Sequence, residues 1–333
     1  MQLKNLKIKI AIYSPNWIGD AVMALPFIQE LKIQNPNALL YVVCKNWVSG
    51  VYKNHSAINH IIPIRSYNLR GFKNTIKTGL KLRSEKFDLF FTLTDSFRSA
   101  LILKLSGAKI RIGYNGQMRS YFLTSAIQKP VEMIHRSRAF LNLLGSEKSV
   151  LKLPRIYLSS SEKEWAKKEM KTLELDKPIA ILPFSVGEGR TLPNDVIKGW
   201  IKKTNKNYIV FGSKNDFEKG KKLISYCGNT LMKSICGKYS LRESIALIDL
   251  CNYTLATDSG MGHISAALGV ATVSFFGKGN TKVTTPFGQK TQIIKHCNPC
   301  LGKLCKKEDK EISCIKKISQ KNVENAVTKL IEQ

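Results

Sequence analysis

The stretch K-I-K-I-A-I-Y-S-P-N-W-I-G-D-A-V, residues 7–22, carries the signal that decides the fold. A β-rich apolar run over residues 7–13 leads into a loop with Pro15 and Gly19. From residue 20 to residue 34 apolar side chains then recur at helical spacing. A strand that passes through a short loop into a helix is the first unit of a doubly wound sheet. The chain is therefore predicted to begin with a parallel α/β fold.

The same strand–helix alternation recurs along the chain, which predicts parallel sheets with helices on both faces. With 333 residues the chain is too long for one ordinary core, so two Rossmann-like domains are expected. The predicted strands are 38–43, 59–64, 87–93, 178–183, 207–212, 231–236, 253–257 and 270–276, and the predicted helices are 72–85, 160–172, 194–204, 216–226, 241–251, 262–268 and 320–331.

The predicted domain boundaries follow from where this alternation stops and restarts. An N-terminal Rossmann-like domain covers 1–155, an inter-domain linker region 156–177 and a C-terminal Rossmann-like domain 178–319. A C-terminal helix over 320–333 is expected to pack back on the N-terminal domain.

The charge balance is the unusual feature of the composition. Lys and Arg number 53 against 24 Asp and Glu, a net charge of +29, which favours anionic partners, although a compositional bias toward Lys explains much of it. Zinc-finger spacing, RNP-type aromatics and a helix-turn-helix are missing from the sequence, so nucleic acid is not an expected partner. No signal peptide and no run of about 18 apolar residues occur, so the chain is expected to be cytoplasmic.

The first candidate site is P-N-W-I-G-D-A-V at residues 15–22. It lies where the first strand turns into the first helix, and ligands of open α/β sheets collect at the carboxyl ends of strands. Gly19 lets the backbone approach a ligand, and Asp20 stands near the helix start. The alternative is that Asp20 is only an N-cap, and its position alone favours that role.

The second candidate site is A-T-D-S-G-M-G-H at residues 256–263, again between a predicted strand and a predicted helix. Backbone N–H groups and the helix dipole favour a phosphate there, and glycines leave room for it. The alternative is a capped helix with an incidental His263, but the combined pattern favours a ligand. A third loop, F-S-V-G-E-G-R at 184–190, adds Arg190, a cation suited to phosphate.

Four cysteines lie within residues 297–314, at Cys297, Cys300, Cys305 and Cys314. Four thiols can hold zinc, but the spacing is irregular and reduced, unliganded thiols are favoured. P-loop, G-x-S-x-G and H-E-x-x-H motifs are missing, which argues against a nucleoside triphosphatase, an α/β serine hydrolase and a zincin.

Taken together, these motifs resemble glycosyltransferase family 9, the ADP-heptose:lipopolysaccharide heptosyltransferases. The resemblance spans about residues 8–330, and its most specific parts are S-P-N-W-I-G-D at 14–20 and the D-S-G-x-x-H motif at 258–263. D-S-F-R-S-A-L at 95–101, R-I-G-Y-N-G-Q-M-R at 111–119, F-G-S-K-N-D at 211–216 and N-P-C-L-G-K-L-C at 298–305 resemble the heptosyltransferase II branch.

The resemblance implies a GT-B architecture, with two Rossmann-like domains facing across a cleft. It also implies transfer of L-glycero-D-manno-heptose from ADP-heptose to the first inner-core heptose of lipopolysaccharide, with inversion and without a metal or other cofactor. Asp20 matches the general base. The donor-binding positions are Arg190, Gly237, Asp258, Ser259, Gly260, Met261 and His263, and the acceptor-binding positions are Trp17, Gly19, Ser96, Arg98 and Arg119.

One segment departs from the family pattern. Where relatives carry G-P-A-K-R-W-P, this chain reads G-E-G-R-T-L-P at 187–193, with Arg190 for the usual lysine, Leu192 for the tryptophan and an added Glu188. Heptosyltransferase I, another family 9 transferase and a non-catalytic binding protein of the same fold remain as alternatives. The acceptor lies at an anionic membrane, so peripheral association at the inner face of the inner membrane is expected through Arg65, Arg70, Lys73, Lys77, Lys81 and Arg83.

Overall fold

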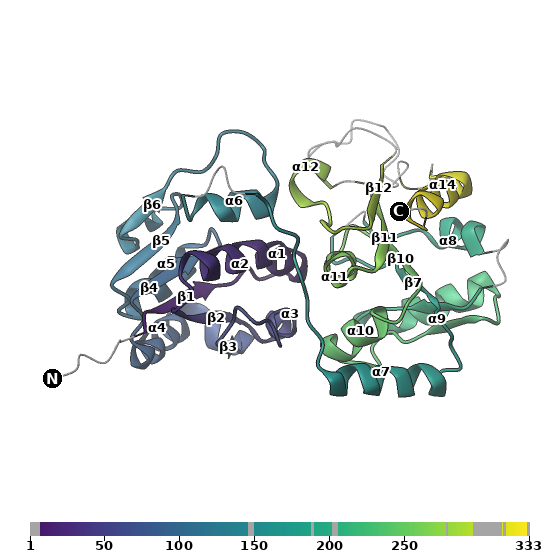
Figure 1. The fold of residues 1–333 in the computed structure, drawn as a ribbon, viewed down its shortest axis with the longest axis horizontal. Coiled ribbons are helices and arrows are strands. Elements are labelled where there is room, and N and C mark those ends of the chain that lie inside the picture. Colours follow the sequence, from purple (N-terminus) through teal and green to yellow (C-terminus); the bar gives the residue numbers. More distant parts are fainter. Residues whose placement is uncertain are drawn as a thin grey trace. The chain divides into compact units, whose positions relative to one another are not determined.

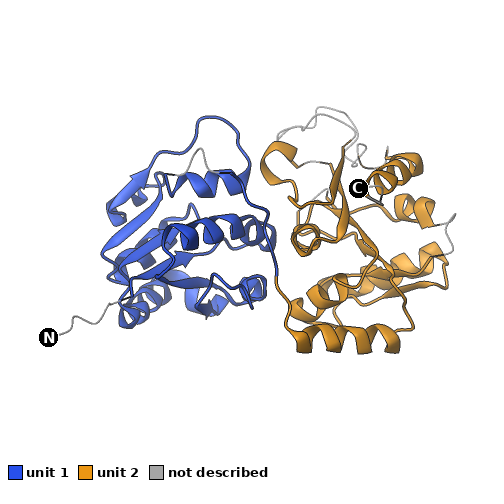
Figure 2. Cartoon of the chain, viewed as in Figure 1, with its two compact units in different colours: residues 1–156 blue, residues 157–333 orange. Residues whose placement is uncertain are grey.

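The computed structural model describes residues 7–145, 150–187, 190–201, 206–277, 279–295, 315 and 318–331. The chain divides into two compact units, Met1–Ile156 and Tyr157–Gln333 (Figure 2). Each unit contains one six-stranded sheet, and every strand pair in both sheets is parallel. The α/β fold class predicted from the sequence is thus confirmed.

Unit 1 has the strand order β3-β2-β1-β4-β5-β6. Its strands are β1 (Lys9–Tyr13), β2 (Leu39–Lys45), β3 (His60–Ile64), β4 (Leu89–Thr92), β5 (Ile110–Tyr114) and β6 (Ser125–Ile127). Its α-helices are α1 (Ile18–Met23), α2 (Leu25–Gln34), α3 (Ser49–Tyr52), α4 (Gly71–Lys81), α5 (Phe97–Leu105) and α6 (Arg136–Asn142) (Figure 1). The chain leaves β1 in one direction for β2 and in the other for β4, so the sheet has its switch point between β1 and β4.

Unit 2 repeats this order as β12-β11-β10-β7-β8-β9. Its strands are β7 (Ile179–Leu182), β8 (Tyr208–Val210), β9 (Met232–Ser234), β10 (Tyr253–Thr257), β11 (Ala271–Phe276) and β12 (Thr291–Lys295). Its α-helices are α7 (Ser160–Thr172), α8 (Asn194–Ile201), α9 (Phe217–Cys227), α10 (Leu241–Ile248), α11 (Gly260–Leu268), α12 (Thr281–Thr284) and α14 (Gln320–Ile331).

Both faces of each sheet are covered, which explains why the central strands β1, β4, β7 and β10 are almost wholly buried. In unit 1, Ala11 and Tyr13 belong to the core shared with α5, while Phe91 of β4 contacts Phe27 of α2 with ring centroids 5.2 Å apart. In unit 2, Ile181 faces the core with α8, α9 and α14, and Leu182 faces the core with α7 and α10.

The first predicted helix, 20–34, is two helices in the structure. α1 ends at Met23 and α2 begins at Leu25 with Pro26 in its first turn. Proline has no N–H to continue the helical hydrogen bonds, so the chain changes direction at Ala24.

Two segments near the predicted boundaries belong to unit 2. Within the predicted linker region 156–177, helix α7 packs on α10, where Arg242 donates to Glu162 at 2.6 Å. The C-terminal helix, which was expected to pack on the N-terminal domain, belongs to unit 2. Helix α14 contacts β11, β12 and α8, because Val323, Ala326 and Leu330 on one side of it enter the core of unit 2.

Candidate active site

Asp20 lies beyond the carboxyl end of β1, in the first turn of α1. The N-cap is Trp17, whose side chain makes no capping bond, so Asp20 is not the N-cap that the alternative interpretation required. Its carboxylate Oδ1 is 3.8 Å from Nε of Arg136 in α6, and the side chain is 24% exposed. Asp20 is therefore a partly exposed carboxylate that has a cation nearby and is accessible to a ligand.

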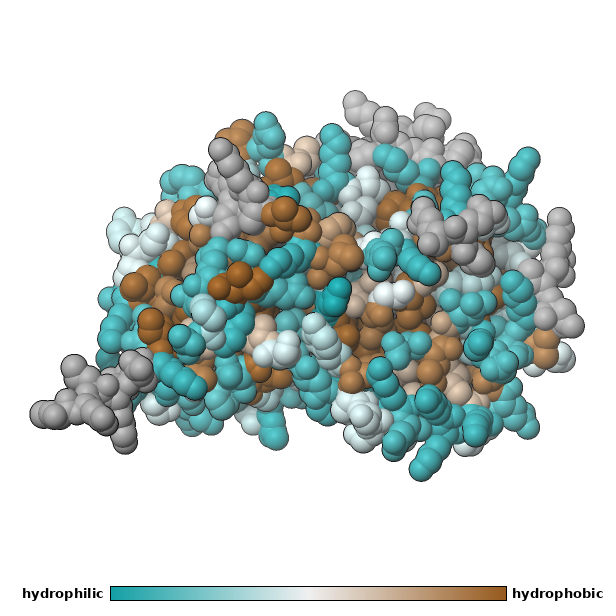
Figure 3. Space-filling model, viewed as in Figure 1, coloured by the Kyte–Doolittle hydropathy of each residue, from teal (hydrophilic) through white to brown (hydrophobic). Residues whose placement is uncertain are grey.

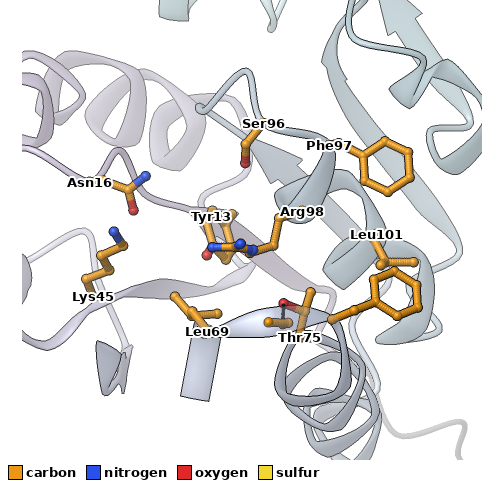
Figure 4. A pocket seen from close by; sticks show the side chains of 11 residues that line it. Tyr13, Asn16, Lys45, Leu69, Thr75, Ser96, Phe97, Arg98 and Leu101 are labelled. Carbon is orange, nitrogen blue, oxygen red and sulfur yellow. Dashed lines mark hydrogen bonds between the residues drawn. The ribbon is translucent and has the colours of Figure 1, made fainter. Parts of the chain in front are cut away.

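A cavity of about 530 Å³ opens beside this loop in unit 1 (Figure 4). Tyr13 at the end of β1 and the residues after β4 line it, so it lies at the switch point of the sheet, where ligands of such folds bind. Ser96 and Arg98, two predicted acceptor residues, are in its wall. Two more predicted acceptor residues lie at the start of α1: Trp17 is 62% exposed, and Gly19 is buried inside the helix.

Ser96 also has a structural role, because it is the N-cap of α5. Its Oγ accepts from the backbone N–H of Ser99 at 3.2 Å. This cap starts the helix at Phe97 and places Arg98 in the first turn, at the edge of the cavity. The two predicted residues are thus brought together by one helix start.

Arg119 is not in the cavity wall, and its side chain is only 1% exposed. Its guanidinium donates to the carbonyl of Tyr114 at 2.5 Å, to the carbonyl of Thr94 and to Oδ1 of Asp95 at 3.2 Å. Arg119, which was predicted to bind the acceptor, is thus placed away from the cavity, and each of these three bonds is made inside the protein. Arg119 instead ties the loop after β5 to the loop after β4, which carries Ser96.

In unit 2, the predicted phosphate site is the start of α11. The helix begins at Gly260, two residues earlier than expected, with Ser259 as an N-cap whose side chain makes no capping bond. The first-turn N–H groups of such a helix have no partner within the helix, and the helix dipole favours an anion near them. Gly262 is needed for the close packing, since a Cβ there would lie 3.0 Å from Cβ of Ala256 in β10.

Asp258 and Arg190 form an ion pair beside this helix start. Oδ2 of Asp258 lies 3.2 Å from Nη1 of Arg190, and the Asp258 side chain is buried whereas the Arg190 side chain is 39% exposed. Oγ1 of Thr257 donates to the Arg190 carbonyl, and Oγ of Ser185 donates to the Asp258 carbonyl at 3.3 Å. The loop after β7 and the loop after β10 are therefore joined, and the free edge of Arg190 faces solvent.

The remaining predicted donor residues fall into two places. Met261 is in the first turn of α11, and His263 follows in the same helix with a buried side chain. Gly237 lies after β9 with φ of +74°, and a Cβ there would be 3.0 Å from Cα of Lys214. A side chain is excluded by both the left-handed backbone and this contact.

Glu188 and Gly189 lie outside the described residues, as do the clustered cysteines Cys297, Cys300, Cys305 and Cys314. Within the described ranges no group of three or more His, Cys, Asp or Glu side chains is placed to hold a metal ion. Cys44, Cys227, Cys236 and Cys251 are buried and reduced. Burial raises the pKa of the Cys44 thiol to about 12, which makes it a poor nucleophile.

Lys45, the last residue of β2, lines the cavity and was not predicted as a site residue. The sequence gives little indication that Lys45 binds a ligand, because lysine is common at the ends of strands. The structure thus supplies a carboxylate and a cationic cavity in unit 1, and a helix start with an oriented arginine in unit 2.

The chain matches known proteins along most of its length. A family model described as glycosyltransferase family 9 (heptosyltransferase) matches residues 75–311. Lipopolysaccharide heptosyltransferase 2 of Escherichia coli strain K12 is 25% identical over 308 residues, covering 86% of this chain and 88% of that protein. Lipooligosaccharide heptosyltransferase 2 of Haemophilus ducreyi is 27% identical over 334 residues, covering 91% of this chain and 93% of that protein.

Solved structures agree in fold. The structure of E. coli ADP-heptose lps heptosyltransferase II superposes with a TM-score of 0.83 at 23% identity and covers 98% of this chain and 99% of that one. E. coli heptosyltransferase WaaC with ADP gives a TM-score of 0.73 at 14% identity, covering 97% and 99%. At these identities the likeness shows a shared two-domain α/β fold of the GT-B type.

Proposed function

The chain belongs to glycosyltransferase family 9, and we propose that it moves heptose from ADP-heptose to the inner core of lipopolysaccharide. The proposed sugar is L-glycero-D-manno-heptose, and the proposed acceptor is the first inner-core heptose, as in Hep-Kdo2-lipid A. The relatives named heptosyltransferase 2, which match 86% to 97% of this chain, support this choice within the family.

We propose that unit 2 binds the donor diphosphate. The N–H groups of Ser259, Gly260 and Met261 meet at the start of α11, where a phosphate is favoured by both hydrogen bonding and the helix dipole. Arg190 adds a guanidinium that Asp258 holds in place at 3.2 Å. Asp258, being buried and negative, acts by orienting Arg190 rather than by touching the phosphate. These groups stabilise the leaving diphosphate, so the reaction needs no metal.

The proposed chemistry in unit 1 is general base catalysis by Asp20. An acceptor hydroxyl attacks the anomeric carbon, the new C–O bond forms as the bond to the diphosphate breaks, and the carboxylate of Asp20 takes the hydroxyl proton. One displacement of this kind inverts the anomeric centre. The observation that supports this role is the partly exposed Asp20 carboxylate beyond the end of β1, with Arg136 3.8 Å away.

The altered loop at 187–193 bears on the donor. Leu192, which replaces the usual tryptophan, is buried in the core of unit 2, and its N–H donates to the carbonyl of Pro183 at 2.8 Å. It therefore anchors the loop rather than presenting a ring to a ligand. Arg190 remains the cation of this loop, so the donor diphosphate keeps its proposed partner.

A transfer assay with ADP-heptose and two acceptors tests the proposal. One acceptor ends in Kdo and the other in a single heptose. We expect transfer only to the heptose-terminated acceptor, and we expect Asp20→Asn to lower kcat by about 10²- to 10⁴-fold with unchanged binding of ADP-heptose in calorimetry. Transfer to the Kdo-terminated acceptor indicates heptosyltransferase I activity, and full activity of Asp20→Asn refutes the base role.

We also propose that unit 1 associates with the anionic inner face of the inner membrane. In the part of the chain that the structure describes, no helix is long and apolar enough to cross a membrane. All six basic residues that were predicted for the contact are exposed: Arg65, Arg70, Lys73, Lys77, Lys81 and Arg83. Tyr67, Phe72 and Leu80 are exposed among them, at 56%, 64% and 46%. Hydrophobic side chains of this kind lie between hydrophilic ones on the surface drawn in Figure 3.

A further inference from the structure

The cavity of unit 1 is lined by two cations and by apolar side chains. Figure 4 shows the Lys45 ammonium and the Arg98 guanidinium directed toward one hollow, beside Tyr13 and Asn16. The apolar part of the wall includes Leu69, Phe72 and Leu101; Leu69 is drawn beside the two cations and Leu101 beyond Arg98. The residues that line the cavity include no aspartate and no glutamate.

The two cations lie close enough to repel one another. The pKa of Lys45 is below its usual range, because burial disfavours its charge and because Arg98 adds a like charge. Arg98 also acts on Tyr13, where its charge lowers a pKa that burial raises. Two cations that face one hollow cost free energy unless an anion lies between them.

In the part of the chain that the structure describes, no carboxylate supplies that anion. Asp95, the nearest acid to Arg98 in the sequence, is paired with Arg119 at 3.2 Å and with Lys129 at 2.8 Å. Within the described ranges, no carboxylate forms an ion pair with either Lys45 or Arg98. The positive charges of Lys45 and Arg98 are therefore available to bind an anionic ligand.

Lys45 is also fixed in place. Its Nζ lies 4.6 Å from the centroid of the Trp47 ring, a cation–π contact, and Nε1 of Trp47 donates to the carbonyl of Asn16 at 3.0 Å. The Ser96 cap at the start of α5 sets the position of the Arg98 backbone beside the cavity. The Trp47 contact holds the Lys45 ammonium, which reduces the entropy that Lys45 loses on binding.

We infer that Lys45 and Arg98 form a subsite for a phosphate or carboxylate group carried by the acceptor, whose apolar or ring portion lies against Leu69, Phe72 and Leu101. The inference rests on the proposed function only for the identity of the acceptor. The lining of the cavity itself suits an organic anion, with an anionic group at Lys45 and Arg98 and a carbon-rich portion against the apolar side chains.

Direct binding tests the subsite without any transfer reaction. A sugar phosphate, a sugar carboxylate and a neutral sugar of equal size are titrated calorimetrically into the wild-type chain and into Lys45→Gln, Arg98→Gln and Lys104→Gln. Lys104 is the matched control, because it is an exposed lysine near the far end of α5 and does not line the cavity.

We expect each cavity variant to weaken binding of the preferred anion about 10- to 100-fold, the loss for one charge-assisted contact. The neutral sugar should bind weakly and equally to all chains, and Lys104→Gln should behave as wild type. The tighter of the two anions identifies phosphate or carboxylate as the natural group. Unchanged anion binding in both variants, or an equal loss for the neutral sugar, overturns the inference.

A kinetic arm separates this result from the proposed function. If the heptose-terminated acceptor is a substrate, Lys45→Gln and Arg98→Gln should raise its KM and leave kcat near the wild-type value, with Lys45→Arg restoring much of the loss. If no transfer occurs, the proposed function fails while the titrations still decide the subsite.

Discussion

Arg119 has a structural role because its side chain is buried and bonded to backbone carbonyls, although its charge alone suggests ligand binding. Removing the guanidinium in Arg119→Ala leaves the buried carbonyl of Tyr114 without this donor, and the carbonyl of Thr94 keeps only the Thr92 hydroxyl. We expect a loss of about 3 kcal/mol in the free energy of unfolding, because buried acceptors lose charge-assisted bonds. Denaturant unfolding measures it.

The matched control for this variant is Arg155→Ala, since Arg155 is an exposed arginine of the same unit. Arg119→Lys keeps the charge but not the planar fork, so it should recover only part of the stability. A loss that is confined to acceptor affinity, with unfolding unchanged, would restore Arg119 to the ligand-binding residues.

The sequence predicts which polar residues follow the strands and so lie near a ligand site. It does not predict in which direction their side chains point. Asp20, Ser96 and Arg98 lie at strand ends in unit 1, where the sequence predicts ligand contacts. Arg119 lies at a strand end too, but the positive φ angles of Gln117 and Met118 turn the chain so that its side chain is buried. No pattern in the sequence signals that turn, and none signals the pairing of Lys45 with Arg98.

At the scale of helices and strands, burial on both faces decides which elements the sequence reveals. β1 and β10 are central and almost wholly buried, so their sequences are rich in apolar and β-branched residues and were predicted as strands. β5, β6 and β12 are missing from the predictions. All three lie at or next to an edge of their sheet and are partly exposed, and polar residues such as Arg111, Ser125 and Gln292 interrupt their patterns. Edge strands need less apolar surface, and their sequences therefore resemble loops.

The segment between α3 and β3 contains a titration switch that affects stability. His55 is buried, its Nδ1 accepts from the N–H of Ala57 at 3.2 Å, and burial lowers its pKa to about 4. The unfolded chain binds a proton near pH 6.5, whereas the folded chain does so only near pH 4. The contribution of His55 to the free energy of unfolding is therefore fully present above pH 6.5. It falls by roughly 3 kcal/mol as the pH drops from 6.5 to 4.

Unfolding curves measured between pH 7 and pH 4 test this switch. His55→Asn keeps an acceptor for the Ala57 N–H but does not titrate, so its stability should depend less on pH over this range. His60→Gln is the control, because His60 is exposed. An equal pH slope for His55→Asn and the wild type would show that other groups dominate.

At the scale of the whole molecule, we expect attraction to an anionic surface to depend less on the net charge of +29 than on where lysines and arginines occur without neighbouring acids. Helix α4, G-F-K-N-T-I-K-T-G-L-K, contains three lysines and no acid. Its buried side is made of small residues: a Cβ on Gly79 would lie 2.6 Å from Cβ of Leu105 in α5. That close packing leaves the lysines and Phe72 outward. Helix α7 of unit 2 is as rich in lysine but carries three glutamates.

This contrast predicts that membrane binding depends on α4 and not on net charge. Lys73, Lys77 and Lys81 are exposed and spaced four residues apart, and Lys163, Lys167 and Lys171 of α7 have the same spacing and exposure. Replacing the α4 lysines by glutamine should weaken binding to anionic vesicles about 100-fold, because each lysine contributes about 1 kcal/mol near such a surface. The same change in α7 removes equal charge and should have a much smaller effect. Vesicle sedimentation measures both, and raising the salt should weaken wild-type binding because it shortens the Debye length. Equal losses from the two helices, or binding to neutral vesicles as strong as to anionic ones, would show that α4 is not the contact.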